Sequence, residues 1–124
     1  MNKKAIDRLT GFCVITGASS GIGLELTKLA AKDGVALLLV ADRDLSEAES
    51  AAKAHGASQV ETLETDLGTR DGIEKLVETI GERPVDALIA NAGHGLGDAF
   101  LTQKWEDIAH VIDTNVKGTV SLVH

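Results

Sequence analysis

Short runs of apolar residues alternate along the chain with segments in which apolar residues recur every three or four positions. The runs predict four strands, at 12–16, 35–41, 60–63 and 85–90, of which the third is the weakest. The periodic segments that follow predict four helices, which begin near Ile22, Ser46, Ile73 and Trp105. The chain is therefore predicted to be a series of strand–helix units.

Stop signals bound three of these helices. The first ends at Asp33–Gly34, the second near His55–Gly56 and the third at Gly81. At the start of the second helix, Ser46-x-x-Glu49 is a capping-box pattern, in which the serine side chain accepts a hydrogen bond from the backbone of the first turn. We therefore expect a structural role for Ser46 and not a catalytic one.

Strands that are apolar throughout and alternate with helices are typical of a parallel sheet covered on both faces. Right-handed crossovers with a reversal after the third strand predict the strand order 3-2-1-4, which is half of a doubly wound α/β fold. Ligands of such sheets bind beyond the carboxyl ends of the strands, where the order reverses. Two glycine-rich loops, at 16–23 and 91–97, are therefore expected to meet between strands 1 and 4.

The first of these loops has the sequence TGASSGIG and lies where a strand turns into a helix. Gly17 allows a tight exit from the strand, Gly21 lets the backbone approach a phosphate, and Gly23 lets the helix pack closely on the sheet. Backbone N–H groups around Ser20 to Ile22 and the positive end of the helix dipole favour a pyrophosphate. No lysine follows the glycines, so the loop is not of the ATPase type. The alternative is a glycine turn without a ligand.

Asp42 stands at the end of the second predicted strand, about 20 residues after the glycines. A carboxylate at this position can accept hydrogen bonds from a ribose diol and would repel a 2'-phosphate, which favours NAD over NADP. Arg43 could offset part of that repulsion, so NADP stays possible. The alternative for Asp42 is a solvated or helix-capping carboxylate.

The composition is that of a globular protein with a single domain over 1–124. A net charge of −7 and an aromatic content of 2% argue against nucleic-acid binding. The longest apolar run, 35–41, is far shorter than the about 20 residues of a membrane span, and no apolar segment follows the first lysines as in a secretory signal. Cys13 is the only cysteine and is interpreted as a small hydrophobe of the first strand. We therefore expect a cytoplasmic protein without disulfides.

The four histidines, His55, His94, His110 and His124, do not show the spacing of metal ligands. His94 alone lies in the predicted loop 91–97, where it could contact a substrate or be a solvated loop residue. We therefore expect no metal site and no catalytic histidine.

Four short motifs stand in order on the predicted elements. They are TGASSGIG with the spacing TGxxxGxG, Asp66-Leu67, Asn91-Ala92-Gly93 and Asn115-Val116. Together, over nearly the whole chain, they resemble the short-chain dehydrogenase/reductase (SDR) family. The resemblance implies a Rossmann-like NAD(P)-binding fold and hydride transfer between a nicotinamide dinucleotide and a small-molecule carbonyl or alcohol substrate.

The resemblance also assigns the cofactor-binding residues position by position. The residues of the implied site are Gly17, Ser19, Ser20, Gly21, Ile22, Gly23, Asp42, Arg43, Asp66, Leu67, Asn91, Ala92 and Gly93. The glycine loop would border the pyrophosphate and the adenosine ribose, and Asp42 would hold the ribose hydroxyls. Asp66 and Leu67 would flank the adenine, and 91–93 would border the nicotinamide-side ribose. For Asn91 the alternative is a strand-end turn that bonds neighbouring backbone.

One face of the last helix is marked by Trp105, Ile108, Ile112, Val116, Thr119 and Val123. Helical spacing places the amide of Asn115 on this apolar face, where it must find hydrogen-bond partners. By resemblance Asn115 is catalytic, because the matching asparagine of the family helps to hold a water in a proton relay, and Gly118 would ease a local irregularity of the helix. The alternative is an ordinary buried amide satisfied by carbonyl groups.

The main departure from the family concerns the proton donor. Family members place a serine and a Tyr-x-x-x-Lys pair downstream of the position where this chain ends, and this sequence contains no tyrosine. Relative to the family, the chain is therefore expected to be a truncated, cofactor-binding part of an NAD(P)-dependent enzyme, inactive by itself. The alternative is a noncatalytic dinucleotide-binding module or a degenerate relative.

Truncation would also leave strand 4 as a sheet edge with unpaired backbone groups. We expect the chain to form homo-oligomers or to aggregate through this edge or through the exposed face of the last helix. The other expected partners are the dinucleotide and the substrate, with no nucleic acid and no membrane.

Overall fold

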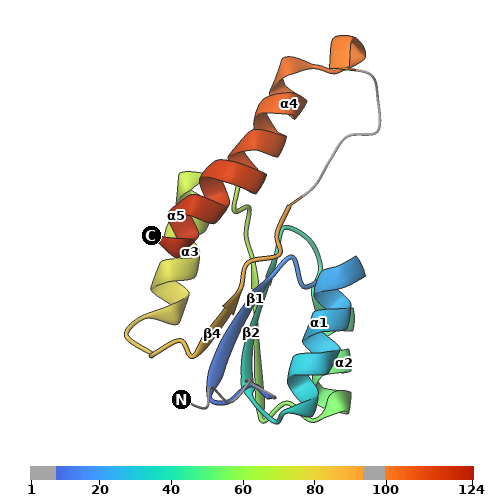
Figure 1. The fold of residues 1–124 in the computed structure, drawn as a ribbon, viewed down its shortest axis with the longest axis vertical. Coiled ribbons are helices and arrows are strands. Elements are labelled where there is room, and N and C mark those ends of the chain that lie inside the picture. The colour runs from blue at the N-terminus through green and yellow to red at the C-terminus, as the bar shows by residue number, and fades with distance from the viewer. Residues whose placement is uncertain (1–7, 94–99) are drawn as a thin grey trace, which may run out of the picture.

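Four parallel strands form one sheet in the computed structural model, which describes residues 8–93 and 100–124. They are β1 (Phe12–Thr16), β2 (Ala36–Ala41), β3 (Gln59–Glu64) and β4 (Ala87–Ile89). Within the described residues the order is β3-β2-β1-β4 and every neighbouring pair is parallel, so the predicted topology is confirmed (Figure 1). The order reverses at β1, between its neighbours β2 and β4.

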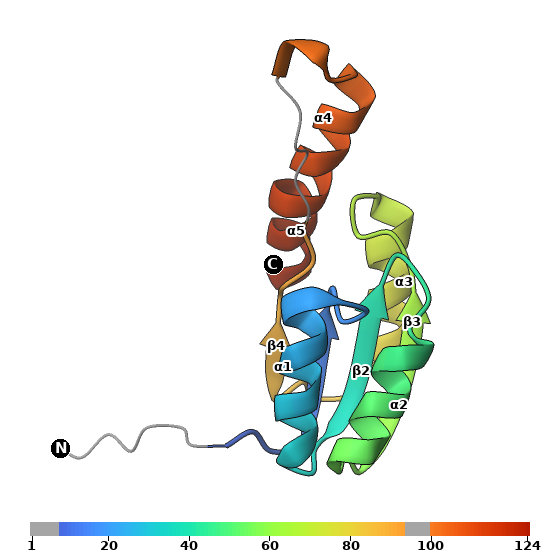
Figure 2. The ribbon, with the colours of Figure 1, turned by 90° about the vertical axis from the view of Figure 1, so that its right-hand side faces the viewer.

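Helices cover both faces of this sheet. They are α1 (Gly21–Lys32), α2 (Ser46–His55), α3 (Arg70–Ile80), α4 (Trp105–Ile112) and α5 (Thr119–Val123), with a 3-10 turn at Phe100–Thr102. On one face lie α1 and α2, and on the other lie α3 and α5 (Figure 1). A π-helical segment, Asp113–Gly118, joins α4 to α5, and α4 extends past the carboxyl ends of the strands (Figure 2).

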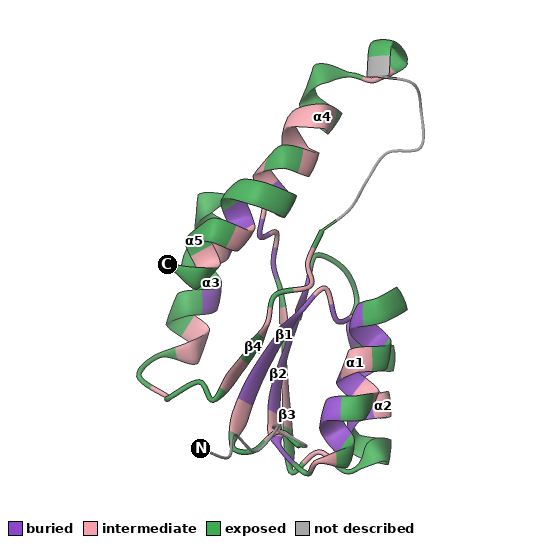
Figure 3. Ribbon diagram, in the orientation of Figure 1, coloured by how far each residue is buried: buried purple, intermediate pink, exposed green. Residues whose placement is uncertain are grey.

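Alternate residues of the central strands point to opposite faces and build two cores. The core under α1 and α2 includes Cys13, Ile15, Leu37 and Leu39, with Ala30, Ala31, Ala48 and Ala52 from the helices. The core on the other face includes Val14, Leu38, Val40, Leu67 and Leu76. Figure 3 shows the buried residues along the middle strands and on the inner sides of the helices. Each fully buried leucine stabilises the fold by about 1.5–3 kcal/mol, so β2, buried on both faces, is the centre of the fold.

Cys13 lies in the first of these cores with none of its surface exposed, as predicted for a small hydrophobe. Burial raises the pKa of its thiol, and the carboxylates of Asp86 and Asp33 raise it further. The thiol therefore stays protonated at neutral pH, and its role is packing.

β4 is shorter than the apolar run that predicts it. The run covers 85–90, but only Ala87–Ile89 pair with β1. Asp86 closes the start of the pairing: the N–H of Phe12 donates to Asp86 Oδ2 (2.8 Å), and the N–H of Asp86 donates to the carbonyl of Phe12 (2.8 Å). In the described residues β4 has a neighbour on one side only, so Leu88 remains 37% exposed and the expected sheet edge is present.

The apolar face of the last helix, on which Asn115 is expected to need hydrogen-bond partners, is not buried by the described residues. Ile112 and Val116 are 44% and 56% exposed, and Asn115 is exposed as well. The buried positions are instead Thr114 and Gly118. The helix therefore packs through its small residues, and its apolar stripe faces away from the described part of the chain.

Two features explain this difference. The π segment changes the hydrogen-bond pattern from i+4 to i+5, so the helical phase that the sequence suggests shifts within Asp113–Gly118. In addition, Gly118 lies so close to the turn after β3 that a Cβ on Gly118 would overlap the carbonyl oxygen of Leu67. The helix irregularity that the resemblance implies near Gly118 is confirmed as this π segment.

The capping box at Ser46 is also wrong. The N-cap of α2 is Leu45, and Ser46 is the first helical residue. The cap is provided by Asp44, whose Oδ1 accepts hydrogen bonds from the hydroxyl of Ser46 (2.7 Å) and from its N–H (3.1 Å). These hydrogen bonds, led by the one from the hydroxyl, lower the pKa of Asp44. Ser46 keeps a structural role, but it donates to a carboxylate that is a stronger acceptor than its own hydroxyl.

Candidate functional site

A cleft of about 800 Å³ opens at the carboxyl ends of the strands. The loops that follow all four strands contribute to it, as do two side chains of the last helix. It is lined by Gly17, Ser19, Ser20, Ile22, Ala41, Asp42, Arg43, Thr65, Asp66, Leu67, Asn91, Ala92, Gly93, His110 and Thr114. Of the predicted cofactor-binding residues, all line the cleft except Gly21 and Gly23. The predicted meeting of the loops after β1 and β4 is therefore confirmed.

The glycines of the first loop allow positive φ angles and close backbone contacts. Gly17 has φ +66°, and a Cβ there would lie 2.9 Å from the amide nitrogen of Asn91. A Cβ on Gly23 would overlap the carbonyl oxygen of Gly17, so α1 starts in direct backbone contact with the end of β1. Gly21 has φ +56° and no atom within 4 Å of its Cβ position, which leaves open space beside the backbone. The expected tight exit and close helix packing are both present.

The start of α1 is a favourable place for a negative charge. Its N-cap, Ser20, is extended and makes no side-chain cap, and its first turn contains no acidic residue. By contrast, the side chain of Thr69 caps α3 by accepting from the N–H of Gly72 (3.0 Å). The N–H groups of a first turn need acceptors, and the helix dipole favours an anion there. Because Ser19, Ser20 and Ile22 line the cleft, a phosphate group fits this end of it.

Thr16 fastens the loop after β4 to the end of β1. Its buried hydroxyl accepts hydrogen bonds from the N–H of Asn91 (3.0 Å) and of Ala92 (3.0 Å), and it donates to the carbonyl of Ile89 (3.4 Å). The amide of Asn91 also donates to the carbonyl of Gly17 (3.4 Å). The structure thus supports the strand-end-turn interpretation of Asn91, whose side chain bonds neighbouring backbone. The role of Thr16 was missed, although it stands at the head of the glycine motif.

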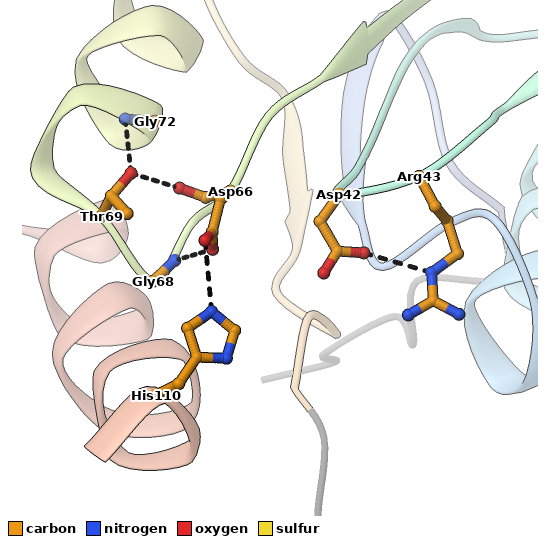
Figure 4. A network of polar contacts seen from close by, with 7 residues as sticks. All are labelled: Asp42, Arg43, Asp66, Gly68, Thr69, Gly72 and His110. Atoms are coloured by element: carbon orange, nitrogen blue, oxygen red, sulfur yellow. Dashed lines mark hydrogen bonds and ion pairs between the residues drawn. The ribbon is translucent and has the colours of Figure 1, made fainter. Parts of the chain in front are cut away.

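Asp42 and Arg43 lie together at the end of β2. Arg43 Nε is 3.2 Å from Asp42 Oδ1, and both side chains are largely exposed to solvent (Figure 4). An exposed pair of this kind adds little stability. The pair matters for the charge that a ligand meets in the cleft. Among the described lining residues, Arg43 is the only cation next to Asp42.

Asp66 is held from three directions at the end of β3. Its carbonyl accepts from the hydroxyl (2.9 Å) and the N–H (3.2 Å) of Thr69, and its Oδ1 accepts from the N–H of Gly68 (2.8 Å). Its Oδ2 lies 3.2 Å from His110 Nε2 of α4 (Figure 4). His110 is not among the residues that the sequence predicts for the site. No spacing in the sequence marks this histidine, because its contact with Asp66 joins residues 44 positions apart in the chain.

Asn115 lies at the edge of the site and not among the residues that line the cleft. A Cβ on Gly93 would be 2.9 Å from Asn115 Oδ1, so the amide stands next to the end of the loop after β4. The neighbouring Thr114 is buried, and its hydroxyl has no hydrogen-bond partner within the described residues. The π segment therefore presents both side chains toward the carboxyl end of the sheet.

Part of the expected site lies outside the described residues. His94 and the glycines at 95 and 97 fall in that gap. In residues 8–93 and 100–124, no three His, Cys, Asp or Glu side chains are grouped so that they could hold a metal ion. None of the helices in the same parts of the chain has the length and apolar character required to cross a membrane.

Comparison with known proteins agrees with this geometry. The sequence profile of the short chain dehydrogenase family matches residues 12–124. The chain is 32% identical over 111 residues to 3-dehydrosphinganine reductase TSC10B of Arabidopsis thaliana, over 88% of this chain and 33% of that protein.

Solved structures of short-chain dehydrogenases and reductases have the same fold as this chain. L-sorbose reductase from Gluconobacter frateurii, solved with NADPH and L-sorbose, superposes with a TM-score of 0.83 and 30% identity, over 94% of this chain and 46% of that one. A short-chain dehydrogenase from Sphingobium yanoikuyae in complex with NADPH has a TM-score of 0.82 and 31% identity, over 91% and 46% of the two chains. The chain thus spans between about a third and a half of the length of these proteins.

The hydroxyl of Thr16 is expected to stabilise the site more than its methyl group does. Thr16→Val keeps the shape but leaves two N–H groups and a carbonyl without this partner, which should lower the free energy of unfolding by about 1–3 kcal/mol. Thr16→Ser keeps the hydroxyl and should lose about 1 kcal/mol or less. Urea unfolding followed by circular dichroism measures both, and a valine variant as stable as the serine variant would contradict the role of the hydroxyl.

Proposed function

Since this chain belongs to the short-chain dehydrogenase family, we propose that it is the nicotinamide-dinucleotide-binding part of an oxidoreductase. The reaction proposed for the whole enzyme is hydride transfer between the nicotinamide and a carbonyl or alcohol substrate. The observation that carries the proposal is the cleft itself, in which the loops after all four strands meet beside a helix start that has no side-chain cap. Its volume of about 800 Å³ is within the range of ligand-binding clefts.

The lining residues suit the successive parts of a dinucleotide. The N–H groups at the start of α1 would hold the pyrophosphate, with Gly17, Ser19, Ser20 and Ile22 around it. Asp42 would accept from the adenosine ribose hydroxyls, and Asp66 with Leu67 would flank the adenine. The loop 91–93 would border the nicotinamide-side ribose. Gly21 and Gly23 would act through the backbone, because neither lines the cleft.

The catalytic part of the proposal concerns Asn115. We propose that it helps to hold a water in a proton relay, which its place beside Gly93 on a π-helical turn supports. The 124 residues contain no tyrosine, so the proton donor that the family uses would have to come from outside them. Bound nicotinamide would supply the hydride chemistry, and this chain would bind and orient it. The relatives act on substrates as different as a dehydrosphinganine and a sugar, so only the reaction class is proposed.

A noncatalytic dinucleotide-binding module is the second candidate. It is favoured by a cleft lined by most of the predicted cofactor-binding residues in a sequence of 124 residues without tyrosine. Reading the coding sequence beyond the codon for His124 separates the two candidates. A continuing frame with a serine and a Tyr-x-x-x-Lys pair supports the enzyme, and an immediate stop codon supports the module.

For the cofactor we propose NAD, with NADP as a weaker ligand. The support is the carboxylate of Asp42 in the cleft, which would face a 2'-phosphate. Arg43, 3.2 Å away, offsets part of that charge. NADPH is the cofactor named for two of the similar structures, so the balance between these two side chains is the point to test. A cytoplasmic location is proposed as well, supported by the single buried cysteine.

Replacing Gly21 with aspartate is expected to weaken nucleotide binding strongly. Aspartate and asparagine both tolerate φ +56° better than other residues and have the same size, so Gly21→Asn is the matched control for strain. A carboxylate beside the pyrophosphate should weaken NADH binding by about 100-fold or more relative to the asparagine variant. Fluorescence titration with NADH measures the two affinities. Equal affinities would refute the phosphate-binding role of this loop.

Replacing Asp42 with asparagine is expected to shift the cofactor preference toward NADP. Removing the charge leaves Arg43 to attract a 2'-phosphate, so the ratio of the NADP and NAD dissociation constants should fall about tenfold. Calorimetric titration measures both constants. Asp71→Asn, on the exposed first turn of α3, is the control and should leave the ratio unchanged. An unchanged ratio, or a shift toward NAD, would contradict this role of Asp42.

We propose homo-oligomer formation through the edge of β4 or the exposed stripe of the last helix. Leu88 and Val116, 37% and 56% exposed, represent the two surfaces. Light scattering of the 124-residue chain at high concentration should show dimers or larger species. Leu88→Lys or Val116→Lys should reduce them, according to which surface is used. A clean monomer at the same concentration would contradict the proposal.

A further inference from the structure

We propose that His110 is a positioning residue of the nucleotide site, which holds the carboxylate of Asp66 in place to receive the amino group of the purine base. The inference rests on the proposed dinucleotide function. It adds a residue of α4 to the base-binding end of the cleft, where the motifs of the sequence place only Asp66 and Leu67.

The carboxylate of Asp66 is fixed at both oxygens. Gly68 donates its N–H to Oδ1 at 2.8 Å, and this hydrogen bond belongs to the turn itself. Oδ2 is 3.2 Å from His110 Nε2, which comes from an element 44 residues away in the sequence. Rotation of the carboxylate would break both contacts. His110 therefore supplies the contact that ties the orientation of this side chain to α4.

The approach of α4 to this turn depends on small groups. A Cβ on Gly68 would lie 2.6 Å from Thr114 Oγ1 and 3.2 Å from His110 Nε2. Both α4-side residues thus face Gly68, one helical turn apart. Thr114 is buried, while His110 lines the cleft with about 41% of its side chain exposed. The imidazole ring therefore remains within reach of a ligand.

The chemistry of the pair fits this role. A carboxylate only accepts hydrogen bonds, so the contact requires a proton on Nε2 of His110, which the imidazolium or one tautomer of the neutral ring supplies. A carboxylate offers about four acceptor sites, and one held by Gly68 and His110 can still accept from an exocyclic amino group. A half-exposed carboxylate without this support loses rotamer freedom when the ligand binds. Holding it beforehand should improve the affinity for the adenosine part about three- to tenfold.

The test compares affinities for ADP-ribose and NADH, measured by calorimetric titration on the 124-residue chain. His110→Ala should weaken both ligands by the same three- to tenfold factor, because the adenosine part is common to them. His110→Gln keeps an N–H donor at similar reach and should restore the affinity to within about twofold. In an Asp66→Ala background, His110→Ala should cause no further loss. His55→Ala, whose ring lies against the carbonyl of Ala51 on α2, is the matched histidine control.

The outcomes separate this inference from the proposed function. If wild type binds NADH but the glutamine variant is as weak as the alanine variant, His110 does not act through its hydrogen bond and the inference is overturned. Additive losses in the Asp66→Ala background overturn it as well. If Asp66→Ala does not fold, as thermal melting would show, the rescue by glutamine decides alone. If wild type binds neither NADH, NADPH nor ADP-ribose, the proposed function fails and this inference fails with it.

Discussion

The close approach of backbone at the end of β1 is the constraint on which the rest of the site depends. The carbonyl of Gly17 stands where a Cβ on Gly23 would be, so α1 can begin only if that side chain is absent. One residue earlier, the hydroxyl of Thr16 accepts two N–H groups from the loop after β4. These contacts leave no room for a side chain at Gly23 and occupy the hydroxyl of Thr16 as an acceptor. The loops that follow two adjacent strands are therefore held in a fixed relation before any ligand is present.

The local sequence pattern was sufficient to predict the features that depend on this close approach. The strand order follows from apolar runs and right-handed crossovers, and the crevice follows from the reversal of that order at β1. The roles of Gly17 and Gly23 could be inferred because each depends on spacing within one loop. The weakest strand was also found: β3 lies at an edge of the described sheet and has no fully buried residue, but Val60 and Leu63 still pack against the two cores, one on each face.

Features set by distant contacts could not be inferred in the same way. The buried face of the last helix is chosen by the fit of Gly118 against Leu67, and the π segment shifts the helical phase on the way. An apolar stripe shows which face a helix could bury, and not whether any described element covers it. His110 joins the site only because α4 crosses the turn at Asp66, a relation that no spacing within the helix encodes.

The charges of the cleft suggest a division of work between side chains and backbone. Among the described lining residues, each carboxylate already has a partner: Asp42 lies beside Arg43 and Asp66 beside His110. The basic side chains of the cleft are thus placed on acids, and the whole chain carries a net charge of −7. A phosphate would gain little from such side chains, so its attraction must come from the N–H groups and the dipole at the start of α1. In the proposed complex the two carboxylates would then accept hydrogen bonds from neutral donors, the hydroxyls of a ribose and the amino group of a base.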